Sequence, residues 1–343
     1  MRTARRFFSA ATAASPRPRS TRILVTGAGG QIGMELVHLL NQRLRPLGNS
    51  ALVLATDVRP TPPEFAGCAY EVLDVTEEKR LRELVDAHRI DTIVHLASLL
   101  SANGEKNPAL AMHVNRGGAE AVLNVAAGKA LKVFAPSTIA AFGPSTPRDL
   151  TPDNTVMRPT TMYGVTKVYL ELLGEYYERK FGVDFRSVRY PGVLSHAALP
   201  GGGTTDYAVE IFYDALRTGA YTSFLAADTA LPMMYMPDAL TAAVDLIDAP
   251  KEKLTQQVYN VTGVSFTPRE LGAAVSRALV AAGKAPLKMG YKPDFRQAIA
   301  DTWPRSLDDS AARKDWGWKH TFGTEEIVAD MLKNLGPRLL GKQ

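Results

Sequence analysis

A glycine-rich turn at residues 27–33 constrains the fold of this chain more than any other stretch. The turn follows a short apolar run at residues 23–26, which is typical of a strand buried on both faces, and a helical pattern comes after it. Its glycines, Gly27, Gly30 and Gly33, have the spacing G-x-x-G-x-x-G. Glycine lets a backbone turn tightly and approach a ligand, and the N–H groups at the start of a helix favour an anion. The stretch therefore predicts a strand, turn and helix that bind the pyrophosphate of a dinucleotide, and the alternative is a turn that serves only close packing.

Short apolar runs alternate with helical patterns along the first half of the chain. The runs lie at residues 51–56, 70–73, 92–97, 131–135 and 184–189, and helical patterns lie at about 76–88, 108–127 and 163–180. Strands that alternate with helices form parallel sheets, because each crossover needs a helix. The alternation predicts an α/β fold with a doubly wound parallel Rossmann sheet that is covered by helices on both faces.

The sequence predicts two portions behind a leader of twenty residues. Residues 21–193 are expected to form the dinucleotide-binding Rossmann domain, and residues 235–262 are expected to return to it with a strand at 257–261. Residues 194–234 and 263–343 lose the regular alternation and carry mostly helical patterns. They are expected to form a smaller, mostly helical portion toward the C-terminus that binds the substrate.

Asp57 lies at a position where a carboxylate can discriminate between NAD and NADP. It ends the second predicted strand, where it can accept hydrogen bonds from the adenine ribose hydroxyls and repel a 2′-phosphate. NAD is therefore favoured over NADP, although the nearby Arg59 would favour the phosphate. Asp74 and Val75 end the third strand and are expected to contact the adenine; the alternative for Asp74 is a cap before Thr76.

Tyr163 and Lys167 are four residues apart at the start of a predicted helix, so they lie on the same helix face. A free tyrosine is a poor base at neutral pH, and a nearby ammonium group lowers its pKa. Together they predict a general acid/base unit. Thr138 follows a strand whose carboxyl end faces the same region, and its hydroxyl is expected to bind a substrate oxygen, with Ser137 as the competitor. His95 lies within an apolar strand and is interpreted as a core residue.

Charge and cysteine content argue against several classes of protein. The net charge is +5, but residues 1–20 contain five arginines and no Asp or Glu, so the remainder is close to neutral and lacks the basic stripe of a nucleic-acid binder. This Arg-rich and Ser-rich segment predicts a mitochondrial transit peptide, and the alternative is a disordered arm without an address. No apolar run is long enough to span a membrane. One cysteine, Cys68, and no cluster of histidines and carboxylates with metal-ligand spacing argue against a metal site.

With these residues in this order, the chain resembles the extended short-chain dehydrogenase/reductase family from about residue 23 to its C-terminal end. Within that family it is similar to the branch that oxidises L-threonine. The stretches that carry this similarity lie at residues 136–143, 159–167, 201–208, 231–238 and 293–304. The resemblance implies oxidation of L-threonine at C3 to 2-amino-3-oxobutanoate, with NAD as the hydride acceptor. It also implies a mitochondrial matrix location and a homodimer that forms through helices near 108–127 and 163–180.

The resemblance also assigns a role to each residue. Tyr163 is implied as the base, Lys167 as the group that lowers the Tyr163 pKa and binds the nicotinamide ribose, Thr138 as the partner of the reacting oxygen, and Asn115 as the support of Lys167. Further implied cofactor contacts are Gly27, Gly30, Gln31, Ile32, Gly33, Asp57, Asp74, Val75, Leu96, Ala97, Ser98, Pro191 and Val193. The implied substrate contacts beyond Thr138 and Tyr163 are Ser98, Thr204, Thr205 and Trp303.

Two other functions use the same scaffold. A nucleotide-sugar epimerase or dehydratase would use the same tyrosine and lysine, but the second half of the chain shows no basic pocket for a diphosphate. A non-catalytic NAD-binding protein would not need a hydroxyl, a phenol and an amine together. The sequence therefore favours the dehydrogenase.

Overall fold

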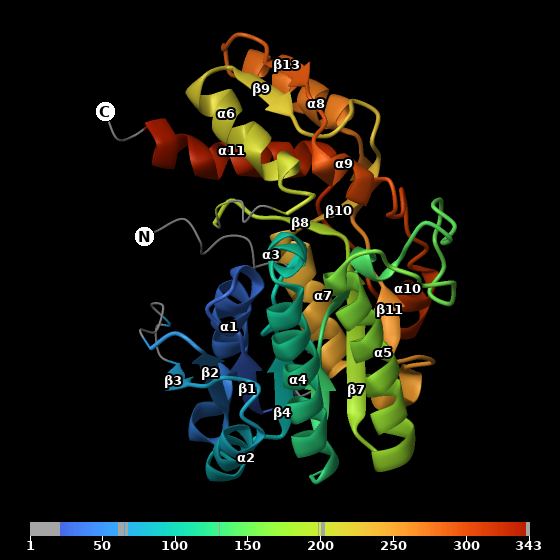
Figure 1. Ribbon diagram of the computed structural model, residues 1–343. Coiled ribbons are helices and arrows are strands. Elements are labelled where there is room, and N and C mark those ends of the chain that lie inside the picture. Colours follow the sequence, from blue (N-terminus) through green and yellow to red (C-terminus); the bar gives the residue numbers. More distant parts are fainter. Residues whose placement is uncertain are drawn as a thin grey trace.

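A parallel sheet covered by helices forms the larger part of the computed structural model, which describes residues 21–60, 65, 68–129, 131–197, 199 and 203–340 (Figure 1). Its strands follow the order β11-β7-β5-β4-β1-β2-β3, with β6 beside β7, and every pairing is parallel. The strands are β1 (Arg22–Thr26), β2 (Leu52–Asp57), β3 (Ala69–Val72), β4 (Thr92–His95), β5 (Lys132–Phe134), β6 (Ser137–Thr138), β7 (Asp184–Tyr190) and β11 (Val258–Asn260). The order reverses between β1 and β4, which confirms the predicted doubly wound sheet.

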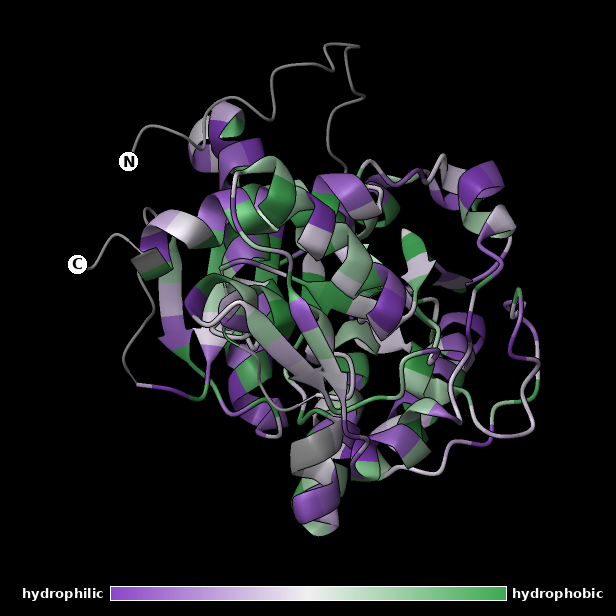
Figure 2. Ribbon diagram, turned by 90° about the horizontal axis from the view of Figure 1, so that it is seen from above, coloured by the Kyte–Doolittle hydropathy of each residue, from purple (hydrophilic) through white to green (hydrophobic). Residues whose placement is uncertain are grey.

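Two hydrophobic cores lie on the two faces of this sheet. The helices that cover it are α1 (Gln31–Leu44), α2 (Glu78–Ala87), α4 (Pro108–Ala127), α5 (Met162–Phe181) and α7 (Met236–Asp248). Leu36 and Leu40 of α1 pack with α7 in one core, and Leu81 of α2 packs with Val122 of α4 in the other. Figure 2 shows hydrophobic residues on the interior strands and hydrophilic residues on outward helix faces. These helices form because their apolar residues recur at helical spacing toward the sheet.

A smaller portion lies above the sheet in Figure 1 and has its own core. It contains a three-stranded sheet, β12-β10-β8, and a two-stranded sheet, β13-β9. The strands are β8 (Gly192–Leu194), β9 (Ala220–Ser223), β10 (Leu231–Tyr235), β12 (Val264–Phe266) and β13 (Lys288–Tyr291). The helices are α6 (Tyr207–Arg217), α8 (Pro268–Ala281), α9 (Phe295–Ala300) and α11 (Thr324–Leu340).

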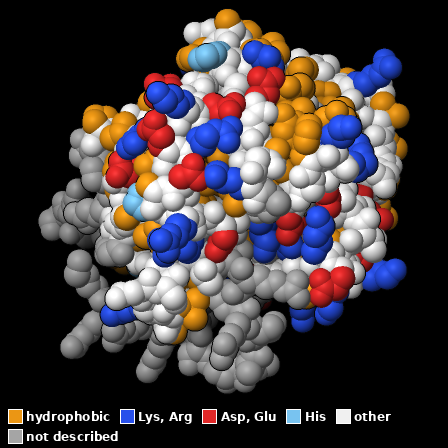
Figure 3. All heavy atoms as spheres, turned by 90° about the horizontal axis from the view of Figure 1, so that it is seen from below, with side chains coloured by type: hydrophobic (Ala, Val, Ile, Leu, Met, Phe, Trp, Pro, Cys, Tyr) orange, Lys and Arg blue, Asp and Glu red, His pale blue; other side chains and the backbone are white. Residues whose placement is uncertain are grey.

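The remaining elements are short. They are the helices α3 (Ser101–Lys106) and α10 (Ser310–Trp316) and the 3₁₀ turns η1 (Arg45–Ser50), η2 (Ile139–Ala141) and η3 (Lys251–Lys253). Figure 3 shows acidic and basic side chains intermixed on the face seen from below. No helix of the described residues is both long and apolar enough to cross a membrane.

Most of the predicted elements are confirmed, including the strand expected at 257–261, which pairs with β7 as β11. The smaller portion is mostly helical, as expected, and it also contains five short strands that the sequence did not predict: β8, β9, β10, β12 and β13. These strands contain three to five residues each, which is too few for a period-2 pattern to stand out. The leader predicted over residues 1–20 lies outside the described residues.

Candidate active site

A cavity of about 280 Å³ lies at the carboxyl ends of the parallel strands, between the large sheet and the smaller portion. Fifteen of the predicted site residues line it: Gly27, Gly30, Gln31, Ile32, Gly33, Leu96, Ser98, Thr138, Tyr163, Lys167, Pro191, Val193, Thr204, Thr205 and Trp303. They come from the glycine turn, from the ends of β4 and β6, from the start of α5, and from loops of the smaller portion. The sequence therefore identified the cavity from residues that are far apart along the chain.

The glycine turn has the geometry that an anion requires. Gly27 has a φ of 64°, and a Cβ atom there would lie 2.6 Å from the backbone nitrogen of Ala97. A Cβ atom at Gly33 would lie 2.5 Å from the carbonyl oxygen of Gly27, so α1 can approach the turn only without side chains. Among the described residues, no side chain caps the N-terminus of α1, and its first turn holds no acidic residue. These N–H groups and the bare backbone fit the pyrophosphate of NAD.

Asp57 receives hydrogen bonds from the turn and from its own neighbour. Its carboxylate accepts from the Gly29 N–H at 2.9 Å and forms an ion pair with Arg59 at 3.0 Å. Burial alone raises the pKa of Asp57, but the hydrogen bonds from Arg59 and Gly29 outweigh burial, so the net pKa lies below its usual value. The group is therefore a carboxylate at neutral pH, beside the turn.

Five predicted site residues are not among those that line the cavity: Asp57, Asp74, Val75, Ala97 and Asn115. Asp74 accepts hydrogen bonds from the Thr76 N–H at 2.9 Å and hydroxyl at 2.7 Å, which is the capping alternative. Val75 is buried in the core beside Gly118, and the Ala97 backbone adjoins Gly27. Their contacts with a cofactor remain predictions.

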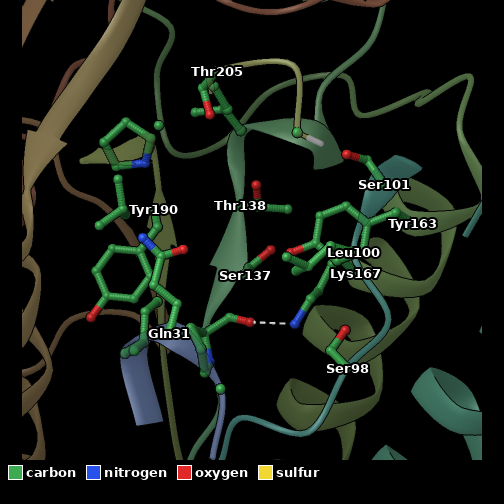
Figure 4. Close-up of a pocket in the computed structure, with 18 of the residues that line it drawn as sticks. Gln31, Ser98, Leu100, Ser101, Ser137, Thr138, Tyr163, Lys167, Tyr190 and Thr205 are labelled. Carbon is green, nitrogen blue, oxygen red and sulfur yellow. Dashed lines mark hydrogen bonds between the residues drawn. The ribbon is translucent and has the colours of Figure 1, made fainter. Parts of the chain in front are cut away.

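Tyr163, Lys167 and Thr138 lie together at one wall of the cavity (Figure 4). The Lys167 ammonium nitrogen lies 5.7 Å from the centre of the Tyr163 ring and donates a hydrogen bond to the Pro136 carbonyl oxygen at 2.7 Å. Burial raises the pKa of Tyr163 to about 12, although a hydrogen bond with Thr138 lowers it. Burial lowers the pKa of Lys167 to about 8, although the charge of Glu171 raises it. The arrangement can hold and move a proton at the phenolic oxygen.

Gly164 explains how the phenol comes close to Thr138. A Cβ atom at position 164 would lie 2.1 Å from the carbonyl oxygen of Ala140, which belongs to η2. The start of α5 therefore packs directly on the turn that follows Thr138. Thr161 caps the helix by accepting a hydrogen bond from the Gly164 N–H at 3.1 Å. The cap and the glycine together fix where α5 begins.

Asn115 binds backbone near the site. Its side-chain oxygen accepts from the Leu99 N–H at 2.7 Å, and its amide nitrogen donates to the Leu99 carbonyl and the Thr166 hydroxyl at 3.1 Å each. The described hydrogen bonds thus join Asn115 to the segment that carries Ser98 and to α5, rather than to Lys167 itself. Its support of Lys167 stays a prediction.

His95 is a core residue, as predicted. Its Nδ1 atom lies 2.9 Å from the buried Thr26 hydroxyl, and burial, followed by the charge of Lys167, lowers its pKa to about 3. The described residues include no group of three or more His, Cys, Asp or Glu side chains that could hold a metal ion.

Sequence reasoning missed several residues that line the cavity. They are Leu100, Ser101, Pro136, Ile139, Tyr190, Gly203 and Asp206. Gly203 and Asp206 lie in a stretch that carried the family resemblance, and Pro136 and Tyr190 adjoin predicted strand ends, so the signal was present. Leu100 and Ser101 had no such signal, because α3 has only six residues and no apolar period.

Comparison with known proteins agrees with this geometry. The NAD dependent epimerase/dehydratase family matches residues 23–262. The protein named "L-threonine 3-dehydrogenase, mitochondrial" from Bos taurus is 46% identical over 312 residues, which cover 91% of this chain and 82% of the bovine one. The crystal structure of L-threonine dehydrogenase from Phytophthora infestans is 56% identical, with a TM-score of 0.87, and the match covers 93% of this chain and 100% of that one. A monomeric L-threonine 3-dehydrogenase from a metagenome is 42% identical, with a TM-score of 0.84 and coverage of 92% and 99%.

Proposed function

The chain belongs to the NAD dependent epimerase/dehydratase family, and we propose that it oxidises L-threonine at C3 to 2-amino-3-oxobutanoate. The observation that carries the proposal is the meeting of a phenol, an amine and a hydroxyl (Tyr163, Lys167 and Thr138) in the cavity that the glycine turn also lines. The identity of 46% to 56% with proteins named as threonine dehydrogenases supports the substrate. The chain is an NAD-dependent oxidoreductase.

Tyr163 and Thr138 act on the C3 hydroxyl oxygen of the substrate, and Lys167 acts on Tyr163. Tyr163, as a phenolate, takes the proton of the C3 hydroxyl, and the Thr138 hydroxyl donates a hydrogen bond to that oxygen. Bound NAD supplies the hydride acceptor. Protonated Lys167 stabilises the phenolate. The coupled Tyr163–Lys167 pair releases its first proton near the pKa of Lys167, about 8, so activity should rise with pH up to that value. Asn115 holds the backbone of Leu99, whose neighbours Ser98 and Leu100 line the cavity.

Different residues of the chain are assigned to different parts of NAD. The pyrophosphate is held by the glycine turn and by the first N–H groups of α1, and the adenine ribose is held by Asp57. Asp74 and Val75 are assigned to the adenine. The nicotinamide end is assigned to Leu96, Ala97, Ser98, Pro191 and Val193, several of which line the cavity.

The amino acid is assigned to residues at the mouth of the smaller portion. Thr204 and Trp303 are buried, 3% and 5% exposed, and line the cavity with Thr205 and Ser98. Small hydroxyls and an indole suit a short polar substrate better than a nucleotide sugar. Residues 194–234 and 263–343 thereby serve as the substrate portion, and residues 21–193 with 235–262 serve as the cofactor portion.

One assay tests the activity. Full-length protein with NAD, a chelator and single L-amino acids should produce NADH with L-threonine, and Tyr163→Phe should lower kcat by roughly 10³-fold because the base is lost while the ring remains. Chelation should have no effect. If no NADH forms with L-threonine and the protein turns over a nucleotide sugar instead, the proposal is refuted. A protein that binds NAD but turns over neither L-threonine nor a nucleotide sugar would favour the non-catalytic alternative.

Mitochondrial location and self-association belong to the same proposal. The acid-free composition of residues 1–20 and the mitochondrial name of the bovine relative support an import signal. Fusion of these residues to a fluorescent protein should direct it to mitochondria, and a uniformly cytosolic signal would contradict that. Exposed apolar residues on α5 support a homodimer, although the metagenome relative is described as monomeric.

A further inference from the structure

A buried ion pair lies one helical turn beyond Lys167. Glu171 of α5 is 1% exposed, and Arg189 of β7 is 4% exposed. The Arg189 guanidinium donates to the Glu171 carboxylate at 2.8 Å and 3.0 Å, in a bidentate arrangement. The Ser137 hydroxyl donates a further hydrogen bond to Glu171. The buried carboxylate is therefore paired with a guanidinium and accepts hydrogen bonds on both of its oxygens.

The pair is held rigidly from its far side. Arg189 also donates to the Asp153 carbonyl at 2.7 Å and to the Asn260 side-chain oxygen at 3.2 Å, and it lies 5.2 Å from the centre of the Phe142 ring. The guanidinium is therefore fully engaged within the core. Apolar residues of similar volume often replace a buried ion pair without loss of stability, so stability alone is a weak reason for two charges at this place.

Two consecutive residues connect this pair to the active site. The Pro136 carbonyl accepts from the Lys167 ammonium group, and the next residue, Ser137, donates to Glu171. Lys167 and Glu171 are also four residues apart on α5, where opposite charges attract. Residues 136–137 thus hold Lys167 and Glu171 relative to one another.

We propose that Glu171, anchored by Arg189 and Ser137, is a positioning residue that keeps Lys167 protonated beside Tyr163. The inference rests on the proposed function, since it concerns the same phenol and amine. It also distinguishes the two neighbouring hydroxyls, Ser137 and Thr138. The Ser137 proton is engaged on Glu171, whereas the Thr138 hydroxyl is hydrogen-bonded to Tyr163 in the cavity, which favours Thr138 as the partner of the substrate oxygen.

The other titratable groups near Lys167 do not replace Glu171. Tyr163 precedes Lys167 on the same helix, and its phenol is neutral until it loses its proton to become the phenolate that acts as the base. His95 of β4 is neutral at physiological pH. Arg189 carries the opposite sign, and Asp153 is associated with Arg189 rather than with the lysine. Glu171 is the anion whose charge raises the pKa of Lys167 against the effect of burial.

Coupled titration gives this role a kinetic signature. As the pH rises, the Tyr163–Lys167 pair releases one proton, and only its release from Tyr163 gives the active form. When the lysine holds its proton less tightly, more of the pair loses the proton from Lys167 instead. The rate at the pH plateau then falls, and the acid limb of the pH profile moves to lower pH, whereas a merely structural defect would lower the rate without moving the limb.

The decisive measurement is the titration of Lys167 by NMR in full-length protein labelled with ¹³C at the lysine ε-carbon, with the signal identified by its loss in Lys167→Met. Two variants are compared: Glu171→Gln, and the double variant Glu171→Gln with Arg189→Gln, which leaves no unpaired charge. We expect the Lys167 pKa to fall in both, by about one unit in the double variant, which is roughly a tenfold loss of proton affinity. The plateau rate with L-threonine should fall by a similar factor.

The controls separate this effect from its alternatives. A fall in the single variant alone would mean that an unpaired Arg189 caused it, and would overturn the proposal, as would an unchanged pKa in both variants. Asp184→Asn breaks the other buried arginine pair of β7, Arg186 with Asp184, and should leave the Lys167 titration unchanged. Since the NMR titration needs no turnover, it decides the role of Glu171 even if L-threonine is not the substrate.

Discussion

At the scale of single residues, Asp57 shows how a neighbour changes what one carboxylate can select. Arg59, 52% exposed at its side chain, lies against Asp57 and beside Gly29. The pair leaves Asp57 negative, which disfavours a 2′-phosphate, while Arg59 offers the charge that such a phosphate would need. The choice of NAD therefore depends on the carboxylate and is not enforced by the arginine.

Asp57→Asn should weaken that choice. The amide keeps the size of the side chain but loses its charge, so kcat/KM should fall about tenfold with NAD and rise with NADP, where Arg59 is released. The measurement is the ratio of kcat/KM for the two cofactors. Asp74→Asn is the matched control: Asp74 is bound to Thr76 and assigned to the adenine, which is the same in NAD and NADP, so this variant should leave the ratio unchanged. An unaltered ratio in Asp57→Asn would contradict the assignment.

At the scale of elements, α5 carries the chemistry because three functional side chains share one of its faces. Tyr163, Lys167 and Glu171 recur at four-residue intervals, so each lies one turn beyond the last. The position of the whole row depends on Gly164, where the helix meets the Ala140 carbonyl. One glycine thus sets the distance between the row and Thr138.

Gly164→Ala should damage the enzyme although alanine favours a helix by about 1 kcal/mol over glycine. The added methyl group would lie 2.1 Å from a backbone oxygen, so α5 must shift. We expect kcat to fall roughly 10²-fold and stability to fall by about 1–3 kcal/mol. Activity and thermal unfolding report the two effects. Gly336→Ala in α11, where a Cβ atom meets nothing within 4 Å, is the control that should lose neither.

The sequence predicted the elements whose patterns repeat. The long helices at 108–127 and 163–180 match α4 and α5 because they contain enough turns for an apolar face to be visible. Strands such as β8, with three residues, form because they pair with β10 within the smaller portion, and no local pattern specifies that pairing. Short strands are set by tertiary context.

The residues of the candidate site likewise differ in how far the sequence could predict them. Tyr163 and Lys167 were predictable because their spacing alone places them on one face. Ser137 was only a competitor to Thr138 on the sequence, because the direction of its hydroxyl depends on Glu171, which no spacing rule connects to it. The Asn115 contacts with Leu99 likewise depend on how α4 packs near the end of β4.

At the scale of the whole molecule, α5 leaves an apolar strip toward solvent. Val165, Leu172 and Tyr176 are 42%, 56% and 49% exposed. They recur at helical spacing on the face away from the sheet, and Leu110 of α4 is also exposed, at 44%. Such a strip on neighbouring helices suits a second copy of the chain better than water.

Leu172→Glu should therefore convert a dimer into a monomer, because two copies would each bury a charge at the interface. Light scattering after size-exclusion chromatography gives the mass of each species. Val280→Glu, which changes an exposed apolar residue of α8, should leave the dimer intact. A wild-type protein that is monomeric at every concentration would refute the proposed interface.

The position of the cavity has a consequence for how the chain unfolds. Trp303 and Ile139, on one side of it, belong to the core of the smaller portion, whereas Ile32 and Val193, on the other, pack against a core of the large sheet. A molecule bound between them contacts both cores, and its binding free energy opposes the separation of either. We expect that, when a ligand fills the cavity, the two portions unfold in a single cooperative transition. The ligand would then link the stability of the two portions as well as react.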